Sequence, residues 1–414
     1  MLLVILPTAM IGGVSFLTLL VKHRRVSDAV FARRVWGSAG MSSRRVAIVS
    51  PDDQKVTFVE LFFDLVFVFC VTQVVGLLHG HVNLQSAGSA LLVFWLVWWA
   101  WTQFTWALNA ANTDHPRVQV ISLLATAVAF LLAVGIPRAL GDGALWFAVP
   151  YVALRVVGLL LYSWVASSDP AQRRAVRVFA LVSTTGLLAV LAGGLLGGSG
   201  LYWCWGLAIA LDLAAAGIGA QLEGWNLHPE HFVERHGLIV IIALGETLIV
   251  AAAGLAGATR TPTVIATGVL AVAVTCGLWW SYFRQGRAAF EHALAAREGN
   301  ARSCMARDVF SVTHFPMLCG VIAMAAAMEE ALAHPDGPLV LNLRVALGGG
   351  AMLFVCGTAA AMWRASGRTL PWRWGLAPAA MAGVVALGAV PWIAMTILLA
   401  MLVAVSVIEH RSGE

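Results

Sequence analysis

The chain has 414 residues, of which 60% are hydrophobic and only 11% are charged. A soluble domain carries about 25% charged residues, so this composition excludes a soluble protein. The formal net charge of +5 does not indicate nucleic-acid binding, because the arginines lie in short loops beside apolar segments, where membrane topology accounts for them.

Twelve apolar segments follow one another along the chain, and each is long enough to cross a bilayer as a helix. Their hydrophobicity is continuous rather than alternating, which favours helices over a β-barrel. We therefore expect an all-α, polytopic membrane protein of about twelve transmembrane helices, the last two dividing at Pro391. The predicted spans are 57–79, 87–109, 118–137, 144–166, 175–198, 200–222, 233–256, 262–283, 310–333, 340–363, 375–390 and 391–408.

Residues 1–40 form an N-terminal extension with two open interpretations. An apolar run, "MLLVILPTAMIGGVSFLTLLV", is followed by "KHRR", without the positive leading region of a signal peptide. The extension is either a thirteenth span or the product of a misplaced start site. Met41 begins "MSSRRVAIVSPDDQKVTFVEL", a conventional basic lead-in to a first helix.

Arginine and lysine residues are concentrated in every second loop between the predicted spans. The remaining loops carry only Arg138 and Arg260. Positive residues collect on the cytoplasmic side, so we expect a multi-pass protein of the cell membrane, with both ends of the 41–414 core in the cytoplasm. The polar segment 284–309 is expected to form either a helix near the membrane surface or a solvated connector.

Two stretches of the chain resemble each other. "FVELFFDLVFVFCVTQVV" at 58–75 aligns with "FVERHGLIVIIALGETLI" at 232–249, and "WWAWTQF" at 98–104 is echoed by "WWSYF" at 279–283. The repeat predicts two parallel six-helix halves, 41–222 and 223–414. The alternative is chance similarity between apolar segments.

Ionisable residues within predicted spans are the candidate site, because such residues are rare and usually functional. Glu60 and Asp64 lie four residues apart and share a helix face, so they require a proton or a cation between them. Glu60 alternatively reaches the membrane interface. Arg155, Asp212 and Glu246 are mid-span, and the arginine needs a carboxylate from Asp64, Asp212 or Glu246.

Histidines mark two further positions. The segment "HPEHFVERHG" at 228–237 fits no standard zinc spacing. Pro229 is typical of a first helical position, so a plain helix start is favoured. His314, at the start of a span, is interpreted either as a proton-transfer group or as a histidine with an ordinary hydrogen-bonded role. The five tryptophans of "VFWLVWWAWTQFTW" at 93–106 either pack the interior or line an aromatic cavity.

The chain resembles the bacterial low temperature requirement protein A family from about residue 55 to its end. The resemblance rests on "VELFFDLVFVFCVTQ" at 59–73, "HPEHFVERHGLIVIIALGETLIV" at 228–250 and "HFPMLCGVIAMAAAMEEAL" at 314–332. It implies a membrane protein and little chemistry, since the family is named for a growth phenotype. The motif positions it carries over, without assigned roles, are Glu60, Asp64, Glu234, Gly245, Glu246 and His314.

Three functions are compatible with these residues. The first is a transporter or ion-handling protein, with Asp64, Asp212 and Glu246 as proton or cation ligands in a polar centre between the halves and Arg155 as the counter-charge. The full set of candidate substrate- or ion-binding residues is Glu60, Asp64, Arg155, Asp212, Glu246 and His314. The second is an intramembrane enzyme acting on a lipid through Glu60, Asp64, His231 and His314. The third is a non-catalytic sensor or scaffold.

Cofactor chemistry is not indicated. The six cysteines are scattered without a C-x-x-C pair, and no phosphate-binding glycine loop or nucleophile elbow occurs. We therefore expect no cofactor, no resident metal and no ATP hydrolysis, and we favour a transporter over an enzyme. The expected partners are the lipid bilayer and an unidentified small molecule or ion.

Overall fold

The computed structural model describes residues 47–51, 54–80, 82–257, 259, 261–284, 286–334 and 337–412. Within these ranges the chain is helical, and the one isolated β-bridge pairs Val49 with Ala111. The two interpretations of residues 1–40, and the position of Arg260, lie outside the described residues.

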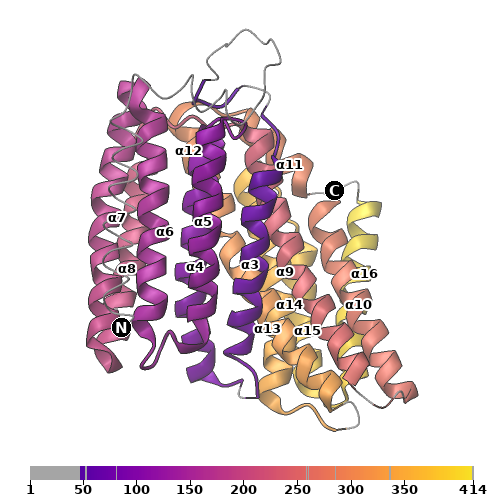
Figure 1. Cartoon of the computed structure of the whole chain (residues 1–414). Helices are drawn as coiled ribbons and strands as arrows, with labels where there is room; N and C mark the ends of the chain where they lie inside the picture. The colour runs from indigo at the N-terminus through magenta and orange to yellow at the C-terminus, as the bar shows by residue number, and fades with distance from the viewer. Residues whose placement is uncertain are drawn as a thin grey trace, which may run out of the picture. The chain divides into compact units, whose positions relative to one another are not determined.

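In the described residues, twelve long helices account for the twelve predicted spans, which confirms the all-α polytopic fold. Figure 1 shows their arrangement. By length and composition, eleven stretches of the described chain are able to cross a membrane, and the remaining long helix, α15, has 17 residues. The long helices are α3 (Phe58–Gly76), α4 (Leu84–Ala110), α5 (Pro116–Gly135), α6 (Ala144–Val165), α7 (Pro170–Leu196), α8 (Gly198–Ala220), α9 (Pro229–Gly257), α10 (Pro262–Phe283), α13 (His314–Ala333), α14 (Leu341–Ser366), α15 (Pro371–Leu387) and α16 (Pro391–Arg411).

Proline begins many of these helices. Pro229 opens α9 and Pro391 opens α16, as the sequence predicted. Proline suits a first helical position because the backbone N–H that it lacks would have no intrahelical partner there, and because its φ is already helical. α3 instead begins with a capping box, in which Glu60 Oε2 accepts hydrogen bonds from the backbone N–H and the hydroxyl of Thr57.

The segment 284–309 is more than a solvated connector. It contains α11 (Gly286–Ala295) and α12 (Gly299–Ala306), followed by the π-helical turn η4 (Arg307–Val312) that leads into α13. Phe290 and Leu294 are fully buried, and α11 contacts α9 and α14. The apolar residues that the sequence places among polar ones therefore anchor this segment to the ends of the long helices.

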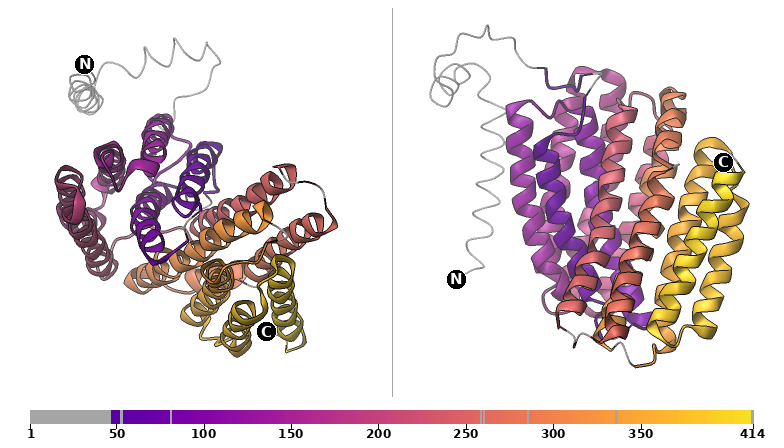
Figure 2. Two further views of the ribbon diagram at one scale, coloured as in Figure 1. Left: turned by 90° about the horizontal axis from the view of Figure 1, so that it is seen from below. Right: turned by 90° about the vertical axis from the view of Figure 1, so that its right-hand side faces the viewer.

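Helix α4 is the interior helix of the arrangement. It contacts α3, α6, α8, α9 and α13, and most of its length is buried. The views along and across the helices in Figure 2 show the long helices running side by side, with the last ones at one edge. Trp95, Trp98 and Trp101 of the tryptophan-rich run are buried in this interior, and their rings pack against neighbouring aromatic rings.

Helices α13 and α14 approach closely at two glycines, and this contact predicts a position-specific effect. A Cβ atom at Gly350 would lie 2.4 Å from the carbonyl oxygen of Gly320 and 2.7 Å from Met324, whereas one at Gly349 would meet only Met381, at 3.7 Å. We expect Gly350→Ala to destabilise the protein by about 1–3 kcal/mol through overpacking. Gly349→Ala is the matched control and is expected to be neutral or stabilising. Thermal unfolding of the purified protein in detergent measures both, and equal melting temperatures would contradict the packing assignment.

Candidate functional site

Four ionisable side chains meet where α3 packs against α9. Arg235 donates from Nη1 to Glu60 Oε1 at 2.7 Å and from Nη2 to Asp64 Oδ1 at 2.7 Å. His231 Nε2 lies 3.0 Å from Glu60 Oε1. All four residues are buried, and together they form the α3–α9 ion cluster.

Helical spacing explains why these four residues meet. Glu60 and Asp64 are four residues apart on α3, and His231 and Arg235 are four residues apart on α9, so each pair lies on one face of its helix. The planar guanidinium of an arginine presents N–H groups in a fork, which allows one side chain to bridge two carboxylates. The cation that the spacing of Glu60 and Asp64 demands is therefore Arg235.

Hydrogen bonds fix the tautomer of His231. The backbone N–H of His228 donates to Asn109 Oδ1 at 2.8 Å, which leaves Asn109 Nδ2 as a donor toward His231 Nδ1 at 2.9 Å. An Nδ1 that accepts a hydrogen bond carries no proton, so the ring is neutral with its proton on Nε2, facing Glu60. With two carboxylates, one guanidinium and a neutral imidazole, the cluster has a formal charge of −1.

Asp64 is the member of the cluster with spare hydrogen-bonding capacity. Its Oδ1 accepts from Arg235 and also from Trp101 Nε1 at 2.9 Å. Its Oδ2 is buried and has no hydrogen-bond partner among the residues that the structure describes. A proton on Oδ2 would cancel the excess charge without breaking a bond shown here.

A second cluster lies on α6 and α8. Arg155 Nη2 donates to Asp212 Oδ1 at 3.0 Å, and Nη1 donates to the hydroxyl of Tyr151 at 2.6 Å. Gln103 of α4 accepts from Arg155 Nε and donates to the Arg155 carbonyl oxygen at 2.9 Å. One guanidinium faces one carboxylate, so this cluster is neutral.

The two clusters occupy opposite sides of α4. Trp101, which binds Asp64, and Gln103, which binds Arg155, are two residues apart, and two helical steps rotate a side chain by about 200°. The structure therefore does not gather Asp64, Asp212 and Glu246 into one polar centre. The partner of Arg155 is Asp212, within the first six long helices, while the α3–α9 ion cluster joins the first six to the last six.

Glu246 and His314 have separate surroundings. Thr72 donates to Glu246 Oε2 at 2.6 Å, and Thr72 lies eight residues beyond Asp64, about 12 Å along α3. His314 uses both ring nitrogens, with Nδ1 2.8 Å from the carbonyl oxygen of Val309 and Nε2 2.7 Å from the hydroxyl of Tyr282. His314 is thus fully hydrogen-bonded within the protein.

Some charged contacts were not foreseen from the sequence. Arg235, Arg364 and Arg373 count as topology markers by the positive-inside rule, yet Arg235 and Arg373 are buried. Arg373 pairs with Glu409, and Asp308 lies between Arg307 and Arg364. The signal for Arg235 was its four-residue spacing from His231, which matches the spacing of the two acids on α3.

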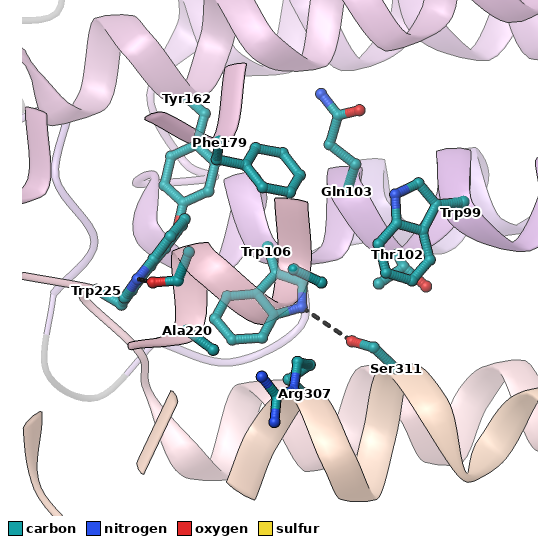
Figure 3. Close-up of a pocket in the computed structure, with 12 residues that line it drawn as sticks. Trp99, Thr102, Gln103, Trp106, Tyr162, Phe179, Ala220, Trp225, Arg307 and Ser311 are labelled. Carbon is teal, nitrogen blue, oxygen red and sulfur yellow. Dashed lines mark hydrogen bonds between the residues drawn. The ribbon is translucent and has the colours of Figure 1, made fainter. Parts of the chain in front are cut away.

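A small aromatic cavity lies on the side of α4 that faces α6, α7 and α8 (Figure 3). Its volume is about 40 Å³, enough for a few water molecules. Trp106 in its wall donates to Ser311 Oγ at 3.2 Å, and buried Tyr162 has a hydroxyl without a partner among the described residues. The other lining residues are Trp99, Thr102, Gln103, Phe179, Ala216, Gly219, Ala220, Trp225 and Arg307. Trp99 and Trp106 thus line a cavity, in agreement with one interpretation of the tryptophan run.

Among the described residues, no group of three His, Cys, Asp or Glu side chains is arranged to hold a metal ion. His228 lies at the start of α9 and His231 belongs to the α3–α9 ion cluster. The Nδ1 of His236 lies 2.9 Å from the carbonyl oxygen of Phe232, and its ring packs against Trp101.

Comparison with known proteins identifies the family of the chain. The family model described as "Bacterial low temperature requirement A protein (LtrA)" matches residues 55–408. The chain belongs to the LtrA family. A curated relative, an uncharacterized protein (RA0937) of Rhizobium meliloti (strain 1021), is 31% identical over 337 residues, which cover 78% of this chain and 80% of the relative. No solved structure matches. The LtrA match includes both ion clusters, Glu246 and His314.

Proposed function

We propose that this LtrA-family protein is a transport protein that handles protons or small cations through the α3–α9 ion cluster. The observation that supports this proposal is the uncompensated charge of that cluster. Two buried carboxylates share one guanidinium, the adjacent imidazole is neutral, and Asp64 Oδ2 has no partner among the described residues. A formal charge of −1 in a low-dielectric interior strongly favours binding of one proton or cation.

The position of the cluster supports a coupling role. Arg235 on α9 bonds simultaneously to both carboxylates of α3, so it joins the first six long helices to the last six. A proton on Asp64 weakens the hydrogen bond from Arg235 to Asp64 and leaves the bond from Arg235 to Glu60 intact. Proton uptake would thereby loosen the α3–α9 contact, as alternating access requires. We also propose that the end of the helix bundle whose loops carry most of the arginines faces the cytoplasm.

The alternative of a lipid-modifying enzyme has less support. Its candidate residues Glu60, Asp64, His231 and His314 are all buried, and His314 has both ring nitrogens hydrogen-bonded within the protein. A reacting headgroup would have to reach groups that already bind one another. A wild-type protein without proton flux would favour the enzyme or the scaffold over the transporter.

Proton flux in proteoliposomes tests the proposal. The protein is reconstituted with a pH-sensitive dye inside the vesicles, and a potassium diffusion potential drives proton entry. Asp64→Asn removes the proton-binding oxygen but keeps a neutral Glu60–Arg235 pair, so we expect a folded protein with flux reduced at least tenfold. Asp114→Asn, which removes an exposed carboxylate, is the control and is expected to retain wild-type flux.

Two results would count against the proposal. If vesicles with wild-type protein showed no more proton flux than empty vesicles, proton transport would be contradicted. Unchanged flux in Asp64→Asn would show that the ion cluster does not carry it.

A further inference from the structure

Helices α10 and α16 contact each other at the edge of the bundle (Figure 1). A groove opens between their C-terminal ends. Its volume is about 1150 Å³, far larger than that of the aromatic cavity. Apolar side chains of α16, including the exposed Val403 and Val407, form one wall. The groove shares no residue with the α3–α9 ion cluster, so a ligand bound in it would be independent of the proposed function.

A buried arginine with a free edge lies in this groove. Arg373, at the start of α15, donates from Nε to Glu409 Oε1 at 2.6 Å and from Nη2 to Glu409 Oε2 at 3.0 Å. It is 1% exposed, and its Nη1 has no hydrogen-bond partner among the described residues. The hydroxyl of Ser281, which also lines the groove, is likewise unpartnered among them. Each of these groups is a hydrogen-bond donor on a residue that lines the groove.

The rim of the groove is basic. Arg284 and Arg411 are exposed lining residues, and His410 lies beside Arg411. The Arg284 guanidinium lies over the Trp280 ring, 5.3 Å from its centroid. The lining contains three arginines and the single carboxylate of Glu409, so it has a formal charge of +2 with His410 neutral.

We propose that this groove binds an anionic phospholipid, with the lipid phosphate between Arg284, Arg411 and Nη1 of Arg373 and an acyl chain along Val403 and Val407. A phosphate oxygen accepts from several N–H groups at once, which suits a buried free guanidinium edge and two rim arginines. Free phosphate would satisfy the arginines but would leave the apolar wall unused. A basic pocket between helices at the end of a bundle is a known form of anionic-lipid site.

Binding of phosphatidylglycerol to the purified full-length protein tests this site. Native mass spectrometry counts bound lipid in phosphatidylglycerol and in phosphatidylcholine, and thermal unfolding follows the effect of each lipid. We expect wild-type protein to retain phosphatidylglycerol and to melt at a higher temperature with it. Arg284→Gln with Arg411→Gln is expected to lower the affinity about 25-fold, since each exposed basic residue contributes about fivefold.

The matched control is Arg174→Gln with Arg177→Gln, which removes two exposed arginines of α7 outside the groove. Equal loss of phosphatidylglycerol in both double variants would overturn the site, because it would show a nonspecific charge effect. Equal binding of phosphatidylglycerol and phosphatidylcholine by the wild type would do the same. A melting shift with inorganic phosphate alone, as large as with the lipid, would overturn the lipid assignment in favour of a soluble anion.

Discussion

Replacing Arg235 with glutamine is expected to lower the stability of the protein by about 3–5 kcal/mol, since it leaves two buried carboxylates without a counter-charge. Glu60 and Asp64 both bond to Arg235 and lie in the same interior. The yield of monodisperse protein after detergent extraction, together with its melting temperature, measures the loss. Arg235→Lys is expected to recover only part of it, because a single ammonium lacks the fork that bridges both acids.

A triple variant separates the charge effect from a general intolerance of position 235. Arg235→Gln combined with Glu60→Gln and Asp64→Asn leaves no unpaired charge in the cluster. Its stability should approach that of the wild type, while proton flux stays lost. If the triple variant were as unstable as the single one, uncompensated charge would not be the cause.

Replacing Asp212 with asparagine is also expected to lower the free energy of unfolding, by about 3–5 kcal/mol. Asp212 supplies the negative charge opposite Arg155, whose other bonds go to the neutral side chains of Gln103 and Tyr151. The variant therefore leaves a buried guanidinium unpaired. Thermal unfolding in detergent measures the change.

A double-mutant cycle isolates this pair. Arg155→Gln together with Asp212→Asn removes both charges, and we expect it to be more stable than either single variant. The coupling between the positions should then amount to at least about 1 kcal/mol, as for side chains in direct contact. Additive losses would mean that the two residues act independently, contrary to the geometry. Glu246→Gln should show no coupling to Arg155→Gln.

The helices were predictable because bilayer thickness sets the length of an apolar segment. The prediction located α10 at the residues where the structure has it, and it divided α15 from α16 at Pro391. It treated the segment 284–309 as one helix or a connector. Helices as short as α11 and α12 depend on contacts with α9 and α14 that a sequence pattern does not display.

The site was predictable only in part. The spacing of Glu60 and Asp64 showed that a proton or cation had to lie between them, and Arg155 was seen to need a carboxylate. The partners were harder to find, because Arg235 is 171 positions from Asp64 along the chain. Arg235 also lies near a predicted helix end, where the positive-inside rule already explains an arginine. Local periodicity places residues on a face but does not say which face of another helix it meets.

The separation of Asp64 and Arg235 along the chain also bears on how the protein is made. At about 5–20 residues per second, ribosomes would need about 10–30 s to synthesise the 171 positions between them. During that interval α3 exists without the arginine that pairs with its acids. The nascent helix must either insert with its acids protonated or wait beside an insertase until α9 arrives, so the last six helices complete the folding of the first.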